Sequence, residues 1–450
     1  MEFLLYKDIL RGLTEGGSIQ MNNSKGKYKS LIITAALIIL MGGCNNSKIN
    51  DKESSSVKSI INDKNSEAVS AIDKNERDES FKINSGLLIG LSKNNEIDTM
   101  VSPFKKVPND YRTLWIHQEN NKITYTEKKG EIITPYKDGF YKIGNNKFFM
   151  SDPSSNSDNQ SDEDLDIIRN FKSYYNFSNI VSHPADKPMK NLFTPETFKK
   201  KYLDTKEGIV NAYKSHVEWL WYAGNNYACV KDFYYDTGGG TYDSGRHHIK
   251  LYDLENLVSL DGRENNVALA DLLDENEKAK LQEYPKKYNK VISSEGMVNS
   301  EQIVDIKNLL LSRKDGKWQV LIPLYGVYQH NGNGSNGRVI EQYINTDIKL
   351  PKTITSHDDL CISWDRIKEK IPQAKDAVSS PNNDVLAVLT PTKLLIYPNP
   401  LNGINKPSLS IDVDSDERII LNQWSTGEYV DKWNKQINIL PKPVKISLVF

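Results

Sequence analysis

The sequence predicts a mainly β protein with short helices, a β-meander or propeller-like body that follows a disordered tether. Three observations support this fold class: short apolar runs alternate with polar residues, turn residues separate these runs, and residues 45–80 are polar and contain no aromatic residue. Alternation with a period of two is typical of half-buried strands. An α+β protein of several domains is the alternative, because helical segments lie among the strands.

Asparagine pairs mark the turns that we expect in the first β region, residues 81–150. They are Asn94-Asn95, Asn120-Asn121 and Asn145-Asn146, and strand-like runs flank each of them. Asparagine adopts the left-handed conformation that tight hairpins require. Each pair is therefore predicted to form the tip of a hairpin.

Helices are predicted where a capping residue precedes an apolar pattern of helical spacing. Ser363 precedes one short helix, which Pro372 ends, and residues 267–291 form another helical stretch. Ser425 and Glu428 have the spacing of a capping box. The helix that they begin presents an apolar face with Tyr429, Val430, Trp433 and Ile437. Residues 382–400, 407–413 and 417–424 are predicted to be strands that come before it.

The charge balance excludes one large class of partners. The chain has 58 Lys and Arg against 59 Asp and Glu, with an isoelectric point near 6.7 and a mean hydropathy of −0.58. A protein without a basic field has no electrostatic basis for binding nucleic acid. We therefore expect no nucleic-acid partner.

Residues 30–48, "SLIITAALIILMGGCNNSK", contain an apolar run from Leu31 to Met41. Eleven residues are too few for a membrane-spanning helix, which needs roughly 20. Three lysines precede the run, at positions 25, 27 and 29, and Cys44 follows it after two glycines. A basic segment followed by a short apolar run is typical of a signal peptide.

This arrangement resembles the lipobox of bacterial lipoproteins, with Met41 standing where leucine is usual. The resemblance covers residues 21–44 and implies that Cys44 becomes the lipidated first residue of the mature protein. The lipid would make the membrane a partner and would place the protein on the outer, extracytoplasmic face of the cell membrane. Residues 1–20 carry Asp8 and Glu15 and do not fit a signal peptide. We therefore expect translation to begin at Met21.

Composition then divides the chain into seven parts. They are a misassigned upstream start at 1–20, a signal peptide at 21–43, a disordered tether at 44–80, an N-terminal β-meander at 81–150, an acidic linker or loop at 151–170, a central β-rich region with helices at 171–350 and a C-terminal β region with short helices at 351–450.

The chain has three cysteines, so Cys229 and Cys361 remain if Cys44 carries lipid. Both lie in apolar, strand-like sequence. A disulfide between them would fit an extracytoplasmic compartment. Two separate buried thiols fit the same sequence, because free cysteine is commonly a small buried hydrophobe.

No catalytic, cofactor-binding or metal-binding residue is predicted. Pro103 and Pro108 follow Ser102 in the Ser102-x-x-Lys105 region, where the nucleophile of a penicillin-recognising enzyme would need to begin a helix. His247 and His248 are adjacent, so on a strand they face opposite sides. The window at 152–163 resembles a calcium loop but has Ser157 where the turn needs glycine. The glycines at 238–240 and the acidic run at 412–417 are predicted to be turns.

Aromatic residues are dense between Trp219 and Tyr235. Trp219, Trp221 and Tyr227 could stack on a glycan, although core aromatics of a sheet are the commoner explanation. We therefore expect a lipid-anchored binding or interaction module whose partner is an envelope protein, a glycan or a small molecule. An envelope hydrolase acting on glycan or peptide is the alternative. A solute-binding protein is a third, although such a protein would show alternating β and α units.

Overall fold

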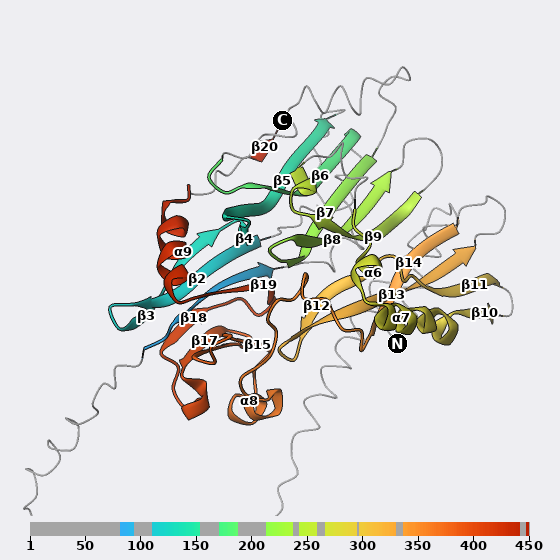
Figure 1. Ribbon diagram of the computed structural model, residues 1–450. Coiled ribbons are helices and arrows are strands. Elements are labelled where there is room, and N and C mark those ends of the chain that lie inside the picture. Colours follow the sequence, from blue (N-terminus) through green and yellow to red (C-terminus); the bar gives the residue numbers. More distant parts are fainter. Residues whose placement is uncertain are drawn as a thin grey trace, which may run out of the picture. The chain divides into compact units, whose positions relative to one another are not determined.

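The computed structural model describes residues 82–93, 110–153, 171–187, 213–236, 243–258, 266–294, 297–329, 336–441 and 447–449 (Figure 1). All of them belong to one unit of the chain, residues 78–450. The predicted leader and tether, the Asn94-Asn95 turn and the glycines at 238–240 lie outside the described residues. So does most of the calcium-like window.

Sheet A combines strands from the N-terminal part of the described chain with one strand from its C-terminal part. Its strands, in spatial order, are β19 (Glu417–Thr426), β1 (Ser85–Lys93), β2 (Asp110–Glu119) and β3 (Lys122–Lys129). All neighbours are antiparallel, and Ser85 of β1 pairs with Thr426 of β19. A strand from the C-terminal part of the chain therefore completes a sheet that the N-terminal part begins.

Sheet B follows sheet A along the chain. It consists of β4 (Ile132–Tyr136), β5 (Gly139–Pro153), β6 (Phe171–Pro184), β7 (Tyr213–Ala223), β8 (Tyr227–Asp236), β9 (Asp243–Asp253) and β20 (Ser447–Val449). The spatial order is β20-β5-β6-β7-β8-β9, with β4 also paired to β5. The β6–β7 and β5–β20 pairs are parallel, and the others are antiparallel.

Sheets C and D complete the set, and both are antiparallel. Sheet C contains β10 (Lys290–Ser294), β11 (Met297–Val304), β12 (Leu310–Lys314), β13 (Lys317–Gln329) and β14 (Asn336–Asn345). Sheet D contains β15 (Asp376–Ser379), β16 (Val385–Leu389), β17 (Lys393–Pro398) and β18 (Leu409–Asp412), in sequence order.

Short helices connect or cover the sheets. They are η2 (Asn256–Val258), α6 (Leu269–Leu272), α7 (Glu275–Tyr288), α8 (Trp364–Lys370), η3 (Pro400–Asn402) and α9 (Glu428–Ile439). The predicted helical stretch at 267–291 contains α6 and α7. The prediction for α8 is confirmed: the Ser363 hydroxyl accepts a hydrogen bond from the Arg366 N–H at 3.4 Å, and Ile367 is fully buried.

Apolar clusters join successive sheets. The clusters include Leu88 and Ile180 between sheets A and B, Leu251 and Val320 between sheets B and C, and Ile89 and Ile396 between sheets D and A. The side chain of Arg313 joins sheet C to sheet D through Asp376. The four sheets thus contact one another in cyclic order, which makes this a mainly β protein with a propeller-like arrangement of four blades, as predicted.

Two local predictions are wrong. Asn145 and Asn146 lie inside β5, where they pair with Ile180 and Asn179 of β6, so they are not a hairpin tip. Ser425 does not begin a helix, because it lies within β19. The residue that precedes α9 is Gly427, which makes no side-chain cap and has a φ of 60°. Asn120-Asn121 is a hairpin tip, as predicted, with φ angles of 50° and 61°.

Candidate binding cavity

A cavity of about 130 Å³ lies where the four sheets meet. Every sheet contributes to the wall of this cavity. Sheet B provides Trp221 from β7, and sheet C provides Ser312 and Arg313 from β12. Sheet D provides Asp376 and Leu389, with Lys375 directly before β15, and sheet A provides Glu417, Arg418 and Ile419 from β19. A water molecule occupies roughly 30 Å³ in the liquid, so the cavity has room for a few waters or one small solute. The pairing of β19 with β1 therefore helps to build the cavity.

A β-bulge sets the position of Trp221. Leu220 pairs with Val230 of β8 and Tyr222 pairs with Cys229, so Trp221 is the extra residue between the two pairs. Bulges of this kind redirect a side chain out of the regular alternation of a strand. Trp219 is fully buried, whereas Trp221 is partly exposed and reaches the cavity wall.

Two cations face the aromatic wall. The guanidinium carbon of Arg418 lies 3.3 Å from the centroid of the Trp221 ring, and the Lys231 ammonium lies 5.8 Å from it. Lys231 also lies 5.4 Å from the ring centroid of Tyr343. Cations at these distances are attracted by the negative face of the ring, most strongly when water is excluded. Trp221 therefore holds positive charge at the edge of the cavity.

Arg313 is the buried connection among three sheets. Its Nε lies 2.8 Å from an oxygen of Asp376, its Nη1 lies 2.7 Å from an oxygen of Asp358, and its side chain is only 2% exposed. Nη1 also donates to Asn422 of β19 at 3.2 Å. Burial raises the pKa of Asp358, and Arg313 opposes that shift. A buried arginine with two carboxylates fixes the relative positions of sheets C, D and A at the cavity.

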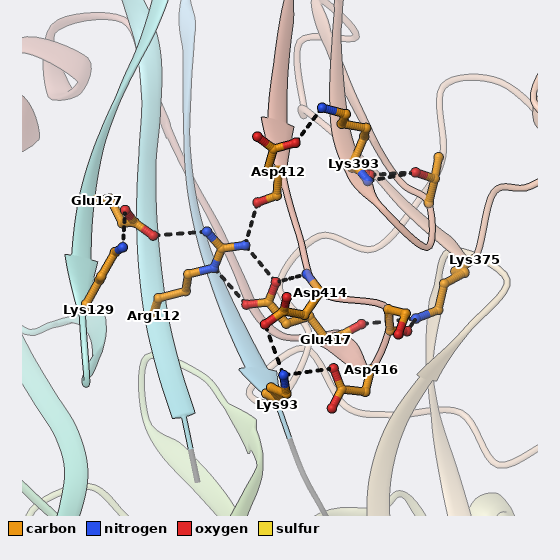
Figure 2. Close-up of polar contacts among 12 residues, drawn as sticks. Lys93, Arg112, Glu127, Lys129, Lys375, Lys393, Asp412, Asp414, Asp416 and Glu417 are labelled. Carbon is orange, nitrogen blue, oxygen red and sulfur yellow. Dashed lines mark hydrogen bonds and ion pairs between the residues drawn. The ribbon is translucent and has the colours of Figure 1, made fainter. Parts of the chain in front are cut away.

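Glu417 is held by Arg112 in a bidentate pair (Figure 2). Both distances between the guanidinium nitrogens and the carboxylate oxygens are 2.7 Å. Arg112 also pairs with Glu127 of β3 at 3.0 Å and donates to the Asp412 carbonyl at 2.8 Å. Parallel donors from one guanidinium give a strong and directional contact. The Glu417 carboxylate in the cavity wall is therefore held by an arginine of sheet A, which it shares with Glu127.

The acidic run at 412–417 is a charged turn, as predicted, and lysines surround it (Figure 2). Lys93 lies 3.1 Å from Asp414 and 3.6 Å from Asp416, and Lys393 pairs with Asp412. The Lys375 ammonium donates to the carbonyl oxygens of Ser415 at 2.8 Å and Glu417 at 3.2 Å. The turn thus places Lys375 at the cavity.

The structure holds both described cysteines as free thiols, so the disulfide between Cys229 and Cys361 is not formed. Cys229 is fully buried on β8, and burial raises its pKa to about 12. Cys361 is partly exposed and accepts a hydrogen bond from the Ser379 hydroxyl at 3.1 Å. Cys229 packs between sheets B and C and Cys361 against sheet D, so the fold separates them. Cys44 lies outside the described residues.

The other residues considered from sequence do not meet at one site. The Nδ1 atom of His248 lies 2.8 Å from an oxygen of Asp232. Within the described ranges, no three His, Cys, Asp or Glu side chains are placed to hold a metal ion. None of the helices described there has the length and apolar character needed to cross a membrane.

Sequence reasoning identified only one cavity residue, Trp221, as a candidate for binding. It missed Arg313, Asp376 and Arg418, which come from three different sheets. One sequence feature could have indicated two of them, because each arginine borders an apolar strand. Arg313 follows "NLLLS" and Arg418 precedes "IILNQW". No known protein family matches the chain, and no curated protein is significantly similar to it.

Proposed function

We propose that this chain is a lipid-anchored binding module on the outer face of a bacterial cell membrane. The anchoring part rests on residues 21–44, where lysines, a short apolar run and Gly-Gly-Cys occur in the order that a lipoprotein signal peptide needs. Acylation of Cys44 would attach the body of the protein, which follows residue 77, to the membrane.

The binding part rests on one observation, the cavity that all four sheets line. Small-molecule sites are typically concave and combine apolar walls with a few fixed polar groups. Trp221, Leu389 and Ile419 supply the apolar wall, and Arg418 and Lys375 supply charge. The two carboxylates in the wall are bonded to arginines, which suits a fixed binding surface.

Metabolic labelling with an alkyne analogue of palmitate in a bacterial host tests the anchor. We expect wild-type protein to be labelled and to sediment with membranes, and C44A to lose the label because it has no thiol to acylate. C361A is the matched control, since it removes a cysteine of the folded body and should keep the label. A labelled C44A variant or an unlabelled wild type would contradict the proposal.

A thermal-shift screen of the full-length protein tests the binding part. The panel contains monosaccharides, amino acids, dipeptides, small organic acids and inorganic anions. We expect one class to raise the melting temperature of wild type and of W364A, whose tryptophan lies on α8, and to have a much smaller effect on W221L. The absence of any response across the whole panel would contradict a role in binding small solutes.

A further inference from the structure

His117 is a buried histidine without a hydrogen-bond partner. It lies on β2 with 4% of its surface exposed, and neither of its ring nitrogens is bonded to any group among the described residues. Its ring stacks on that of Trp115, two residues earlier on the same face of the strand, with 5.4 Å between the ring centroids. Protonation would add a charge and a second N–H donor to this place, which makes its burial far more costly.

Helix α9 covers the face of sheet A on which these two rings lie. It packs against β2 and β19 (Figure 1). The indole N–H of Trp115 donates to the Asn434 side chain at 3.2 Å, and the ring centroids of Trp115 and Trp433 lie 5.8 Å apart. Ile437 is fully buried in the same apolar cluster as Trp115. His117 thus lies beside the contacts that hold α9 on the sheet.

The contacts between α9 and sheet A all involve side chains. Besides the Trp115 contacts, the Thr126 hydroxyl donates to Asn438 at 3.3 Å, and the Lys128 ammonium donates to the Leu440 carbonyl at 3.1 Å. The preceding strand β19 is instead paired with β1 along its length. Elements held by few contacts of this kind open more readily than paired strands. Release of α9 would therefore leave the ladders of sheet A intact.

The charges around His117 oppose the effect of burial without cancelling it. Burial lowers the pKa of His117, and the carboxylates of Glu119 on β2 and Asp431 on α9 act in the opposite direction. Thr124, which pairs with His117 on β3, carries no charge, and neither does Gly86 at the start of β1. Because burial outweighs both carboxylates, a solvated His117 binds a proton more readily than the covered one.

We infer that α9 is released from sheet A when His117 binds a proton, so that pH controls access to the apolar surface formed by Trp115, Trp433 and Ile437. The inference is independent of the proposed cavity function. A histidine that takes up a proton only after release, with an ordinary pKa near 6.5, favours release by up to about tenfold for each pH unit below that value. The helix should therefore stay in place at neutral pH and open in mild acid.

Amide hydrogen exchange of the full-length protein at pH 7.5 and 5.5 tests the inference, after correction for the intrinsic effect of pH on exchange. We expect the opening constant of α9 to rise by about five- to tenfold at pH 5.5 in wild type, while β1 and β19 keep their protection. H117F has no side chain to protonate and should lose this response. H248Q is the matched control, because His248 lies on sheet B beside Asp232, and it should respond as wild type does.

Three outcomes would overturn the inference. The first is a change of less than about twofold in the opening constant of wild-type α9 between the two pH values. The second is the same acid response in H117F as in wild type. The third is a simultaneous loss of protection in α9, β1 and β19, because that result reports global unfolding. If H117F does not fold at pH 7.5, judged by its unfolding midpoint, H117Q takes its place, since glutamine does not titrate either.

Discussion

Replacing Arg313 by methionine should destabilise the protein more than any other single change at the junction of the sheets. The arginine donates five hydrogen bonds, two to Asp376 and one each to Asp358, Asn422 and the Ala377 carbonyl, and its side chain is almost wholly buried. Methionine keeps the length and apolar volume of the side chain. The substitution therefore mainly removes the charge that compensates two carboxylates.

The size of the expected loss of stability follows from the contacts that the two carboxylates keep in R313M. Asp376 keeps the N–H groups of Gly316 and Ala377, and Asp358 keeps the N–H of Trp318, but neither carboxylate keeps a cation. Removing one partner from a buried ion pair costs about 3–5 kcal/mol. That is a large fraction of a total free energy of unfolding of about 5–15 kcal/mol.

Urea unfolding measures the effect. With a slope near 3 kcal/mol/M, the midpoint of R313M should fall by about 1 to 1.7 M. The triple variant R313M/D358N/D376N should recover much of the loss, because it removes the uncompensated charges. K314M, which changes the next residue of β12 at an exposed position, should lie within about 0.5 kcal/mol of wild type. A loss below about 1 kcal/mol in R313M would refute the reasoning.

Two further predictions concern buried titratable groups. Burial lowers the pKa of His117 below its usual 6.5, against smaller opposing effects of Glu119 and Asp431, so the unfolded chain binds a proton that the folded protein does not. Stability should therefore fall as the pH drops below about 6.5. H117F should flatten this dependence, which unfolding midpoints between pH 7.5 and 5 will show; an unchanged slope would contradict the assignment. Burial also lowers the pKa of His183, so H117F should keep part of the dependence of stability on pH. The Cys229 thiol should not react with a thiol reagent at pH 8 until the protein unfolds, and rapid modification of the native protein would contradict its burial.

The sequence predicts a turn correctly only where no other strand pairs with the turn residues. Asn120 and Asn121 form a tip because the strands on both sides end there and pair with each other. Asn145 and Asn146 have the same letters, but β6 pairs with β5 along its length and holds them extended. In the hairpin between β4 and β5, the residue with a positive φ is Lys137.

The capping-box prediction failed for a similar reason. Ser425 and Thr426 pair with Gly86 and Ser85, so the strand continues through the position where a helix cap was expected. Gly427 then turns the chain with a conformation that favours glycine, and α9 begins one residue later. A local pattern cannot register a partner more than three hundred residues away.

The cavity could not be predicted for the same physical reason. Trp221, Arg313, Asp376 and Arg418 are far apart in sequence, and only the cyclic order of the sheets brings them together. Patterning identifies which residues form strands and which face is buried. It does not state which strands are neighbours, because many pairings satisfy the same alternation.

The closure of the ring by β1 and β19 is the claim on which the cavity depends, and a paired-cysteine experiment tests it most directly. Ser85 and Thr426 are cross-strand partners, so S85C/T426C in the full-length chain should form a disulfide, detected as a linked peptide pair by mass spectrometry. S85C/T124C is the control, because β3 lies two strands from β1, roughly 10 Å away and beyond disulfide reach. We predict a crosslink in the first variant and none in the second. No crosslink in S85C/T426C, or equal crosslinking in both, would contradict the account.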